Sequence, residues 1–191
     1  MRFAIWVQGC AKRCPNCINP EGQNLHGGYD LDIGELAEKI QSTKNLTGIT
    51  ISGGEPFLQY EELKKLVIKI RKNSMLDVML YSGYQYSELI KKYPNAQSEL
   101  FPLVDIFIDG EYKDELNNDS MYRGSDNQKI YFFTKKYKQF EDRILSSKQR
   151  DFSFEINSQG EVIFIGVPPK GFYQKFLDQL EKESDLLTKD F

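Results

Sequence analysis

Short apolar runs alternate along the chain with stretches whose apolar residues recur at helical spacing. The runs are rich in β-forming residues, and they predict strands at residues 2–8, 48–52, 76–82, 103–109 and 129–134. Between them, residues 33–40, 63–70 and 86–92 carry apolar side chains three and four positions apart and predict amphipathic helices. Nearly continuous apolar strands that alternate with such helices indicate βα units around a parallel sheet buried on both faces.

The pattern changes near residue 150. Apolar and polar residues alternate over 152–156 and again over 162–165, with the turn-forming sequence of residues 157–160 between them. Alternation with period two on both sides of a turn predicts an antiparallel hairpin. Apolar positions at helical spacing over 173–180 then predict a closing amphipathic helix.

Composition and charge narrow the class of protein. The 191 residues contain no internal repeat or Pro/Gly-rich linker, so we expect one domain over 1–191, with a core of about 1–135 and a hairpin–helix appendage of about 150–191. Interleaved charges sum to −3, which leaves no electrostatic footprint for nucleic acid. No apolar run approaches the ~20 residues of a membrane span, and the N-terminus lacks the pattern of a signal peptide. We therefore expect a cytoplasmic protein that binds neither nucleic acid nor membranes.

The chain has three cysteines and one histidine, and the cysteines are clustered. Cys10, Cys14 and Cys17 have the spacing C-x3-C-x2-C within a non-periodic stretch, residues 10–28, that follows the first predicted strand. Loops of this length inside a domain are usually functional. An odd, tightly spaced set is a poor disulfide framework, and in a reducing cytoplasm clustered thiols more often bind metal or do redox chemistry.

Two metal centres fit this set of donors. With His26 as the fourth ligand, the cysteines would form a Cys3His site of a non-catalytic zinc-binding protein. Without it, they would hold a cubane iron–sulfur cluster, which normally takes four cysteines. Three cysteines would then leave one iron open to a substrate. The spacing alone does not decide between these two centres.

Further polar and glycine-rich motifs lie where predicted strands end or begin. They are Gly53-Gly54-Glu55-Pro56, Ser82-Gly83-Tyr84, Asp109-Gly110 and Arg123-Gly124-Ser125-Asp126-Asn127-Gln128. Open α/β sheets bind ligands at the carboxyl ends of their strands, and bare glycines let the backbone approach a ligand closely. Each motif taken singly also suits a plain turn or a polar surface loop.

Together, the cysteine spacing and the later motifs resemble the radical S-adenosylmethionine (SAM) superfamily. The context from Trp6 to Gly28 is similar to its small activase branch, which includes activators of anaerobic ribonucleoside-triphosphate reductase, and residues 123–128 look like the RGSxNQ segment of these activases. The resemblance covers about 1–135 and keeps the motifs in the expected order. The expected fold class is α/β, a partial (βα) barrel of the radical SAM type with about five parallel strands, plus the C-terminal β-hairpin and helix.

The resemblance also implies cofactors and site residues. A [4Fe-4S] cluster would be held by Cys10, Cys14 and Cys17, and SAM on its open iron would be cleaved reductively to a 5′-deoxyadenosyl radical. The implied cofactor contacts are Asn16, Ile18, Gly53, Gly54, Glu55, Ser82, Gly83, Asp109, Arg123, Ser125, Asn127 and Gln128.

The partners implied by the resemblance are proteins. The radical would take a hydrogen atom from a glycine of a separate glycyl radical enzyme, and a reduced flavodoxin or ferredoxin would supply the electron. A radical SAM enzyme that modifies a peptide or a small metabolite is the alternative within the same chemistry.

Overall fold

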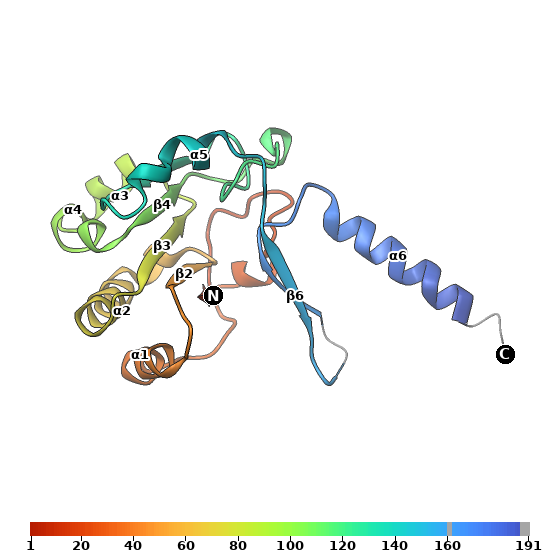
Figure 1. The fold of residues 1–191 in the computed structure, drawn as a ribbon, viewed down its shortest axis with the longest axis horizontal. Coiled ribbons are helices and arrows are strands. Elements are labelled where there is room, and N and C mark those ends of the chain that lie inside the picture. The colour runs from red at the N-terminus through yellow and green to blue at the C-terminus, as the bar shows by residue number, and fades with distance from the viewer. Residues whose placement is uncertain (160–161, 188–191) are drawn as a thin grey trace.

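The computed structural model describes residues 1–159 and 162–187 (Figure 1). A five-stranded sheet of order β1-β2-β3-β4-β5 forms its body, and a separate sheet contains β6 and β7. The strands are β1 (Arg2–Val7), β2 (Gly48–Gly53), β3 (Asp77–Ser82), β4 (Ile106–Asp109), β5 (Lys129–Phe132), β6 (Phe152–Ile156) and β7 (Val162–Gly166). All seven predicted strands are confirmed, although β4 begins later than expected because residues 101–103 form a 3-10 turn. Gly160 of the predicted hairpin turn lies outside the described residues.

The predicted helices are also present. The α-helices are α1 (Ile33–Ser42), α2 (Tyr60–Asn73), α3 (Tyr86–Lys92), α4 (Ala96–Glu99), α5 (Glu141–Ser146) and α6 (Phe172–Leu187). At the start of α1, the side chain of Asp32 accepts a hydrogen bond from the backbone N–H of Glu35 at 3.0 Å and so caps the helix. The sequence did not predict α4 and α5, which are too short to show a helical period.

Strands β1 to β4 are parallel to their neighbours, but β5 is antiparallel to β4, with Ile106 opposite Phe132. The prediction of a fifth parallel strand is therefore wrong. A parallel return needs a crossover, usually through a helix, whereas residues 110–128 contain only one 3-10 turn, Asp114–Leu116. The chain reverses direction there instead.

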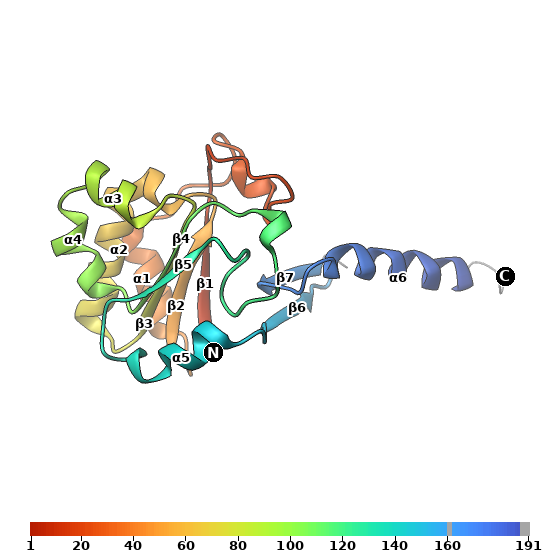
Figure 2. The same cartoon turned by 90° about the horizontal axis from the view of Figure 1, so that it is seen from above.

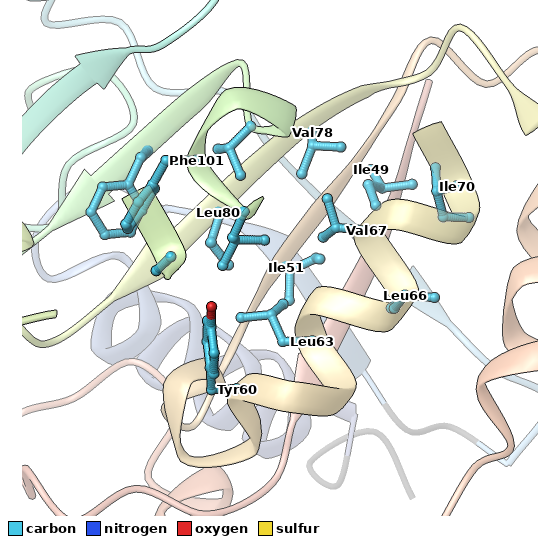
Figure 3. Close-up of a cluster of buried hydrophobic side chains, with 14 of the residues drawn as sticks. Ile49, Ile51, Tyr60, Leu63, Leu66, Val67, Ile70, Val78, Leu80 and Phe101 are labelled. Atoms are coloured by element: carbon cyan, nitrogen blue, oxygen red, sulfur yellow. The ribbon is translucent and has the colours of Figure 1, made fainter. Parts of the chain in front are cut away.

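The larger hydrophobic core lies between the sheet and the helices α1 to α4, which cover one face (Figures 1 and 2). Figure 3 shows α2 directed toward β2 and β3, with Leu63 and Val67 beside Ile51. A second cluster on the other face buries Met79, Ile106 and Ile108. Both faces of the sheet are buried as expected, but aromatic side chains, among them Tyr122 and Tyr137, cover the second one.

This topology brings all the motifs to one edge. The carboxyl ends of β1, β2, β3 and β4 share an edge of the sheet with the amino end of antiparallel β5. Among the described helices, none combines the length and the apolar character that crossing a membrane requires.

Candidate functional site

The backbone of the cysteine loop, residues 8–28, is joined to the glycine-rich motif after β2. The N–H of Gly54 donates to the carbonyl of Val7 at 2.7 Å, and the N–H of Glu55 donates to the carbonyl of Gly9 at 2.8 Å. Gly9 in turn donates to the carbonyl of Gly22 at 2.9 Å, which ties the two ends of the loop together. The end of β2 therefore braces the start of the cysteine loop.

Gly53 and Gly54 are required by this close packing. Gly53 has a φ of +108°, which favours glycine, and a Cβ there would collide with the backbone of Val7. A Cβ on Gly54 would lie 2.6 Å from the carbonyl oxygen of Gly22. The sequence suggested that these glycines admit a ligand, and the structure shows that they admit the chain's own backbone.

The three cysteines are free thiols that lie partly exposed on the loop. The N–H of Cys17 donates to the carbonyl of Cys14 at 3.2 Å, so the two residues share a tight turn. Burial raises the pKa of the Cys14 thiol, whereas a hydrogen bond from the N–H of Tyr112 lowers it, and the charges of Glu111, Cys17 and Cys10 raise it further. The thiols are therefore close enough to influence one another.

The donor set can be tested against the two metal centres. In the part of the chain that the structure describes, no three or more His, Cys, Asp or Glu side chains are arranged to hold one metal ion. His26 is exposed, and the Cys3His zinc site is not assembled. A cubane cluster does not require the thiolates to meet at one ion, because each binds a different iron. Three free thiols on one braced loop therefore fit the cluster.

Glu55 is fully buried and connects β2 to the end of β3. Its carboxylate accepts hydrogen bonds from the N–H of Gly83 at 2.7 Å, from Ser82 Oγ at 2.9 Å and from the N–H of Phe57 at 3.0 Å. Burial raises the pKa of Glu55, while these donors and the charge of Lys12 lower it. The carboxylate thus fixes the position of the Ser82–Gly83 backbone.

Lys12 links the cysteine loop to the same segment. Its ammonium lies 4.2 Å from the centre of the Tyr84 ring, within the range of a cation–π interaction. A Cβ on Gly83 would be 3.2 Å from the Lys12 side chain. The end of β3 therefore lies directly beside the cysteine loop.

Asp109 is buried at the end of β4 and also has internal partners. Its carboxylate accepts from the N–H of Tyr86 at 2.7 Å and from the N–H of Lys129 at 3.2 Å. These bonds connect the end of β4 to the start of α3 and to β5. In this structure Asp109 acts as a bridge between elements.

Residues 123–128 fold back on the connection between β4 and β5. Ser125 Oγ accepts from the N–H of Lys113 at 3.0 Å, and Gln128 accepts from the N–H of Gly124 at 2.8 Å and donates to the carbonyl of Gly110 at 2.7 Å. Among the described residues, Arg123 Nε and Asn127 Oδ1 are two of the three buried side-chain polar atoms without a partner. Buried polar atoms without a partner are rare in folded proteins, and both of these lie in this one segment.

Asn16 and Ile18, the two expected cofactor contacts inside the cysteine motif, differ in their surroundings. Asn16 Nδ2 donates to Asp114 at 3.3 Å and so connects the cysteine loop to the β4–β5 connection. Ile18 is 62% exposed. The structure thus gathers the cysteines, Asn16, the residues after β2 and β3, and the β4–β5 connection at one edge.

Sequence reasoning missed three residues that organise this edge. Tyr112 and Asp114 contact the cysteine loop, and the side chain of Arg150 donates to the carbonyl oxygens of Arg123 at 2.6 Å and Gly124 at 3.2 Å. No local pattern marks these residues, because the contacts by which they organise this edge join segments that are distant in sequence. Their importance comes only from the folded arrangement.

Comparisons with known proteins identify relatives of this chain. Residues 1–131 match the family model described as a 4Fe-4S single cluster domain. The chain is 30% identical over 136 residues to the anaerobic ribonucleoside-triphosphate reductase-activating protein of Enterobacteria phage T4, a match that covers 68% of this chain and 83% of the relative. It is 31% identical over 142 residues to the protein of the same name from Pasteurella multocida, covering 70% and 88%. The pyruvate formate-lyase-activating enzyme of Clostridium pasteurianum is 33% identical over 99 residues, covering 48% and 42%.

Proposed function

Since the chain belongs to the 4Fe-4S single cluster domain family and is a radical SAM activase, we propose that it generates a glycyl radical on a separate partner enzyme. Its cofactors are a [4Fe-4S] cluster and SAM. Cys10, Cys14 and Cys17 would hold the cluster, which would supply the electron for reductive cleavage of SAM and so the radical chemistry that removes a hydrogen atom from the substrate. The relatives are named for activating anaerobic ribonucleoside-triphosphate reductase, which makes that enzyme the first candidate partner.

The observation that carries the proposal is the cysteine loop braced at the carboxyl edge of the sheet. In our proposal, Cys10, Cys14 and Cys17 each bind one iron and leave the fourth without a protein ligand. The hydrogen bonds from Gly54 and Glu55 to Val7 and Gly9 support this role, because they fix the start of the loop against the sheet. Asn16 and Ile18 would flank the cofactors from within the loop.

The residues after β2 and β3 would bind the aminoacyl end of SAM. Gly53 and Gly54 would contribute backbone groups, with Ser82 and Gly83 lining the other side. Because the Glu55 carboxylate is buried against Ser82 and Gly83, it would act mainly by orienting them. Its negative charge, which has no ion-pair partner among the described residues, would also favour the cationic cofactor.

The far side of the cofactor pocket would be formed by Asp109 and residues 123–128. The unpaired atoms Arg123 Nε and Asn127 Oδ1 support a contact with ligand in this segment. Ser125 and Gln128 hold the segment in shape through their hydrogen bonds to Lys113 and Gly110.

We further propose that the sheet is a partial (βα) barrel in a single radical SAM domain over 1–191, with a core of about 1–135 and an appendage of about 150–191. Consecutive strand order with the helices on one face supports this arrangement. A cytoplasmic flavodoxin or ferredoxin would provide the electron.

Anaerobic reconstitution with iron and sulfide tests the proposal. We expect about four irons and four sulfides per chain, formation of 5′-deoxyadenosine from SAM with dithionite, and an organic radical signal on anaerobic ribonucleoside-triphosphate reductase in electron paramagnetic resonance. A colourless, zinc-loaded protein that forms no 5′-deoxyadenosine would contradict the radical chemistry. Formation of 5′-deoxyadenosine without a radical on the reductase would instead favour a peptide or a small metabolite as substrate.

A further inference from the structure

Residues 150–159 and 162–187 form an arm that stands away from the five-stranded sheet (Figures 1 and 2). The arm contains the hairpin of β6 and β7 followed by α6. It lies entirely beyond residue 131, where the family match ends. Any role of the arm is therefore additional to the domain that the relatives share.

The hairpin is only partly covered. The first turns of α6 pack against it, with ring centres 4.5 Å apart for Phe152 and Phe172 and 5.3 Å apart for Phe164 and Phe176. Ile163 is nevertheless 45% exposed and Ile156 is 63% exposed. Among the described residues the hairpin pairs with no third strand, and an isolated two-stranded hairpin is marginally stable in water.

The root of the arm is anchored to residues 111–126, which we call the rim loop. Arg150 donates to the carbonyl oxygens of Arg123 and Gly124, and its guanidinium also pairs with Asp119 at 3.1 Å. Lys170 Nζ donates to the carbonyl of Asp114 at 2.8 Å. Both ends of the hairpin are therefore fixed to the rim loop.

The rim loop in turn contacts the cysteine loop. Asp114 accepts from Asn16 at 3.3 Å, and the N–H of Tyr112 donates to the thiol of Cys14. A protein bound to the arm would consequently be held next to the residues that carry the radical chemistry. This continuity with the site distinguishes the arm from an apolar surface elsewhere on the molecule.

We propose that residues 150–159 and 162–187 form a docking arm for the protein substrate, and that an extended segment of the substrate pairs with a free edge of the hairpin, either the edge of β6 beside Ile156 or the edge of β7 beside Ile163. The inference rests on the proposed function, in which the substrate is another enzyme. Backbone pairing at an open strand edge supplies affinity, and exposed apolar side chains supply specificity. A second copy of this chain fits less well, since each copy carries a net charge of −3.

Two single variants, Ile156→Lys and Ile163→Lys, test the arm. Met75→Lys is the matched control, because Met75 is 91% exposed and lies at the opposite, amino-terminal edge of the sheet. The probe is the anaerobic ribonucleoside-triphosphate reductase of the source organism. We expect the arm variant on the strand that pairs with the substrate to raise the KM for the reductase at least ~10-fold, with unchanged formation of 5′-deoxyadenosine in its absence, while Met75→Lys behaves as wild type.

The outcomes separate this inference from the function on which it rests. If the wild-type chain generates no radical on the reductase, the proposed function fails and the arm proposal fails with it. If the wild type is active and both arm variants keep its KM, only the arm proposal is overturned. It is also overturned if the arm variants lose SAM cleavage without the reductase, or if light scattering shows a dimer of the wild-type chain that they dissociate.

Discussion

The two edges of the five-stranded sheet both bury carboxylates, but they satisfy them with different partners. At the amino edge, Asp77 forms ion pairs with Arg2 and, at 3.3 Å, with Lys136. Asp105 lies 3.4 Å from the guanidinium of Arg71 at the same edge. Each buried negative charge there has a cation in contact with it.

At the carboxyl edge, Glu55 and Asp109 are buried without such a cation. They accept hydrogen bonds from backbone N–H groups, and Glu55 accepts one from a serine hydroxyl as well. Within the described residues neither carboxylate forms an ion pair. The amino edge thus neutralises its buried charges with cations, which stabilises the fold, whereas the carboxyl edge keeps negative potential at the place where we propose that the cationic cofactor binds.

The largest expected effect follows from removing a thiolate at the carboxyl edge. Cys14→Ala should abolish formation of 5′-deoxyadenosine, because it removes one proposed cluster ligand, yet change the free energy of unfolding by less than about 1 kcal/mol. Iron content, product analysis and urea unfolding measure these quantities. His26→Ala is the control and should keep both cluster and activity. Activity that persists in Cys14→Ala would refute its role as a ligand.

The amino edge should respond in the opposite way. Asp77→Asn leaves Arg2 without its buried partner, so we expect the free energy of unfolding, measured in urea, to fall by about 3 kcal/mol. Formation of 5′-deoxyadenosine per bound cluster should not change. Glu62→Gln removes an exposed ion pair with Lys65 and should cost less than about 0.5 kcal/mol. An Asp77→Asn chain of full stability would show that the amino-edge ion pairs do not stabilise the fold.

A smaller loss of stability is expected from Gly54→Ala. The added Cβ would collide with the carbonyl of Gly22, so we expect a cost of about 2 kcal/mol together with a lower cluster content. Gly171→Ala is the control, since Gly171 has a φ of +72° but no atom within 4 Å of an added Cβ. It should cost about 1 kcal/mol and leave the cluster intact. Equal cluster contents in the two variants would argue against bracing of the cysteine loop by β2.

The smallest effect concerns the pH dependence of stability. Because burial raises the pKa of Glu55 above its ordinary value of 4.5, the folded chain binds this proton more tightly than the unfolded chain. The raised pKa therefore lowers the stability of the wild type as the pH rises from 4.5 through the folded-state pKa. Glu55→Gln has no carboxyl group to titrate at this position. The free energy of unfolding of the variant, relative to that of the wild type, should therefore increase between pH 4.5 and the folded-state pKa of Glu55. Urea unfolding of the cluster-free chains measures the difference, and a constant difference would contradict the raised pKa.

The sequence predicts the elements better than the connections between them. The apolar period of α2 and the β-rich runs of β1 to β3 determine those elements locally, so they are placed within a few residues. The direction of β5 is not encoded in its own residues. It follows from the connection before it, because residues 110–128 lack the helical pattern that a parallel return usually requires. That missing pattern would have predicted the reversal.

The residues of the candidate site also differ in how well the sequence predicts them. The cysteine spacing and the glycines after β2 mark it in the sequence, because cluster binding and close backbone packing demand particular residue types. The internal roles of Glu55, Asp109 and Ser125 could not be predicted, since a polar residue in a motif can face a ligand or the protein. The role of Arg150 could not be predicted, because Arg123 and Gly124, whose carbonyl oxygens it binds, are 27 and 26 residues away in the sequence.

The position of β1 at the edge of the sheet has a consequence for biosynthesis. Among the described strands β1 pairs with β2 alone, with Arg2 opposite Gly48, so the cysteine loop leaves the ribosome before the strand that braces it. At about 5–20 residues per second, that interval lasts roughly 2–9 seconds. If cluster insertion requires the braced loop, as our proposal implies, it waits for β2, and during that interval the three thiols are exposed to oxidation.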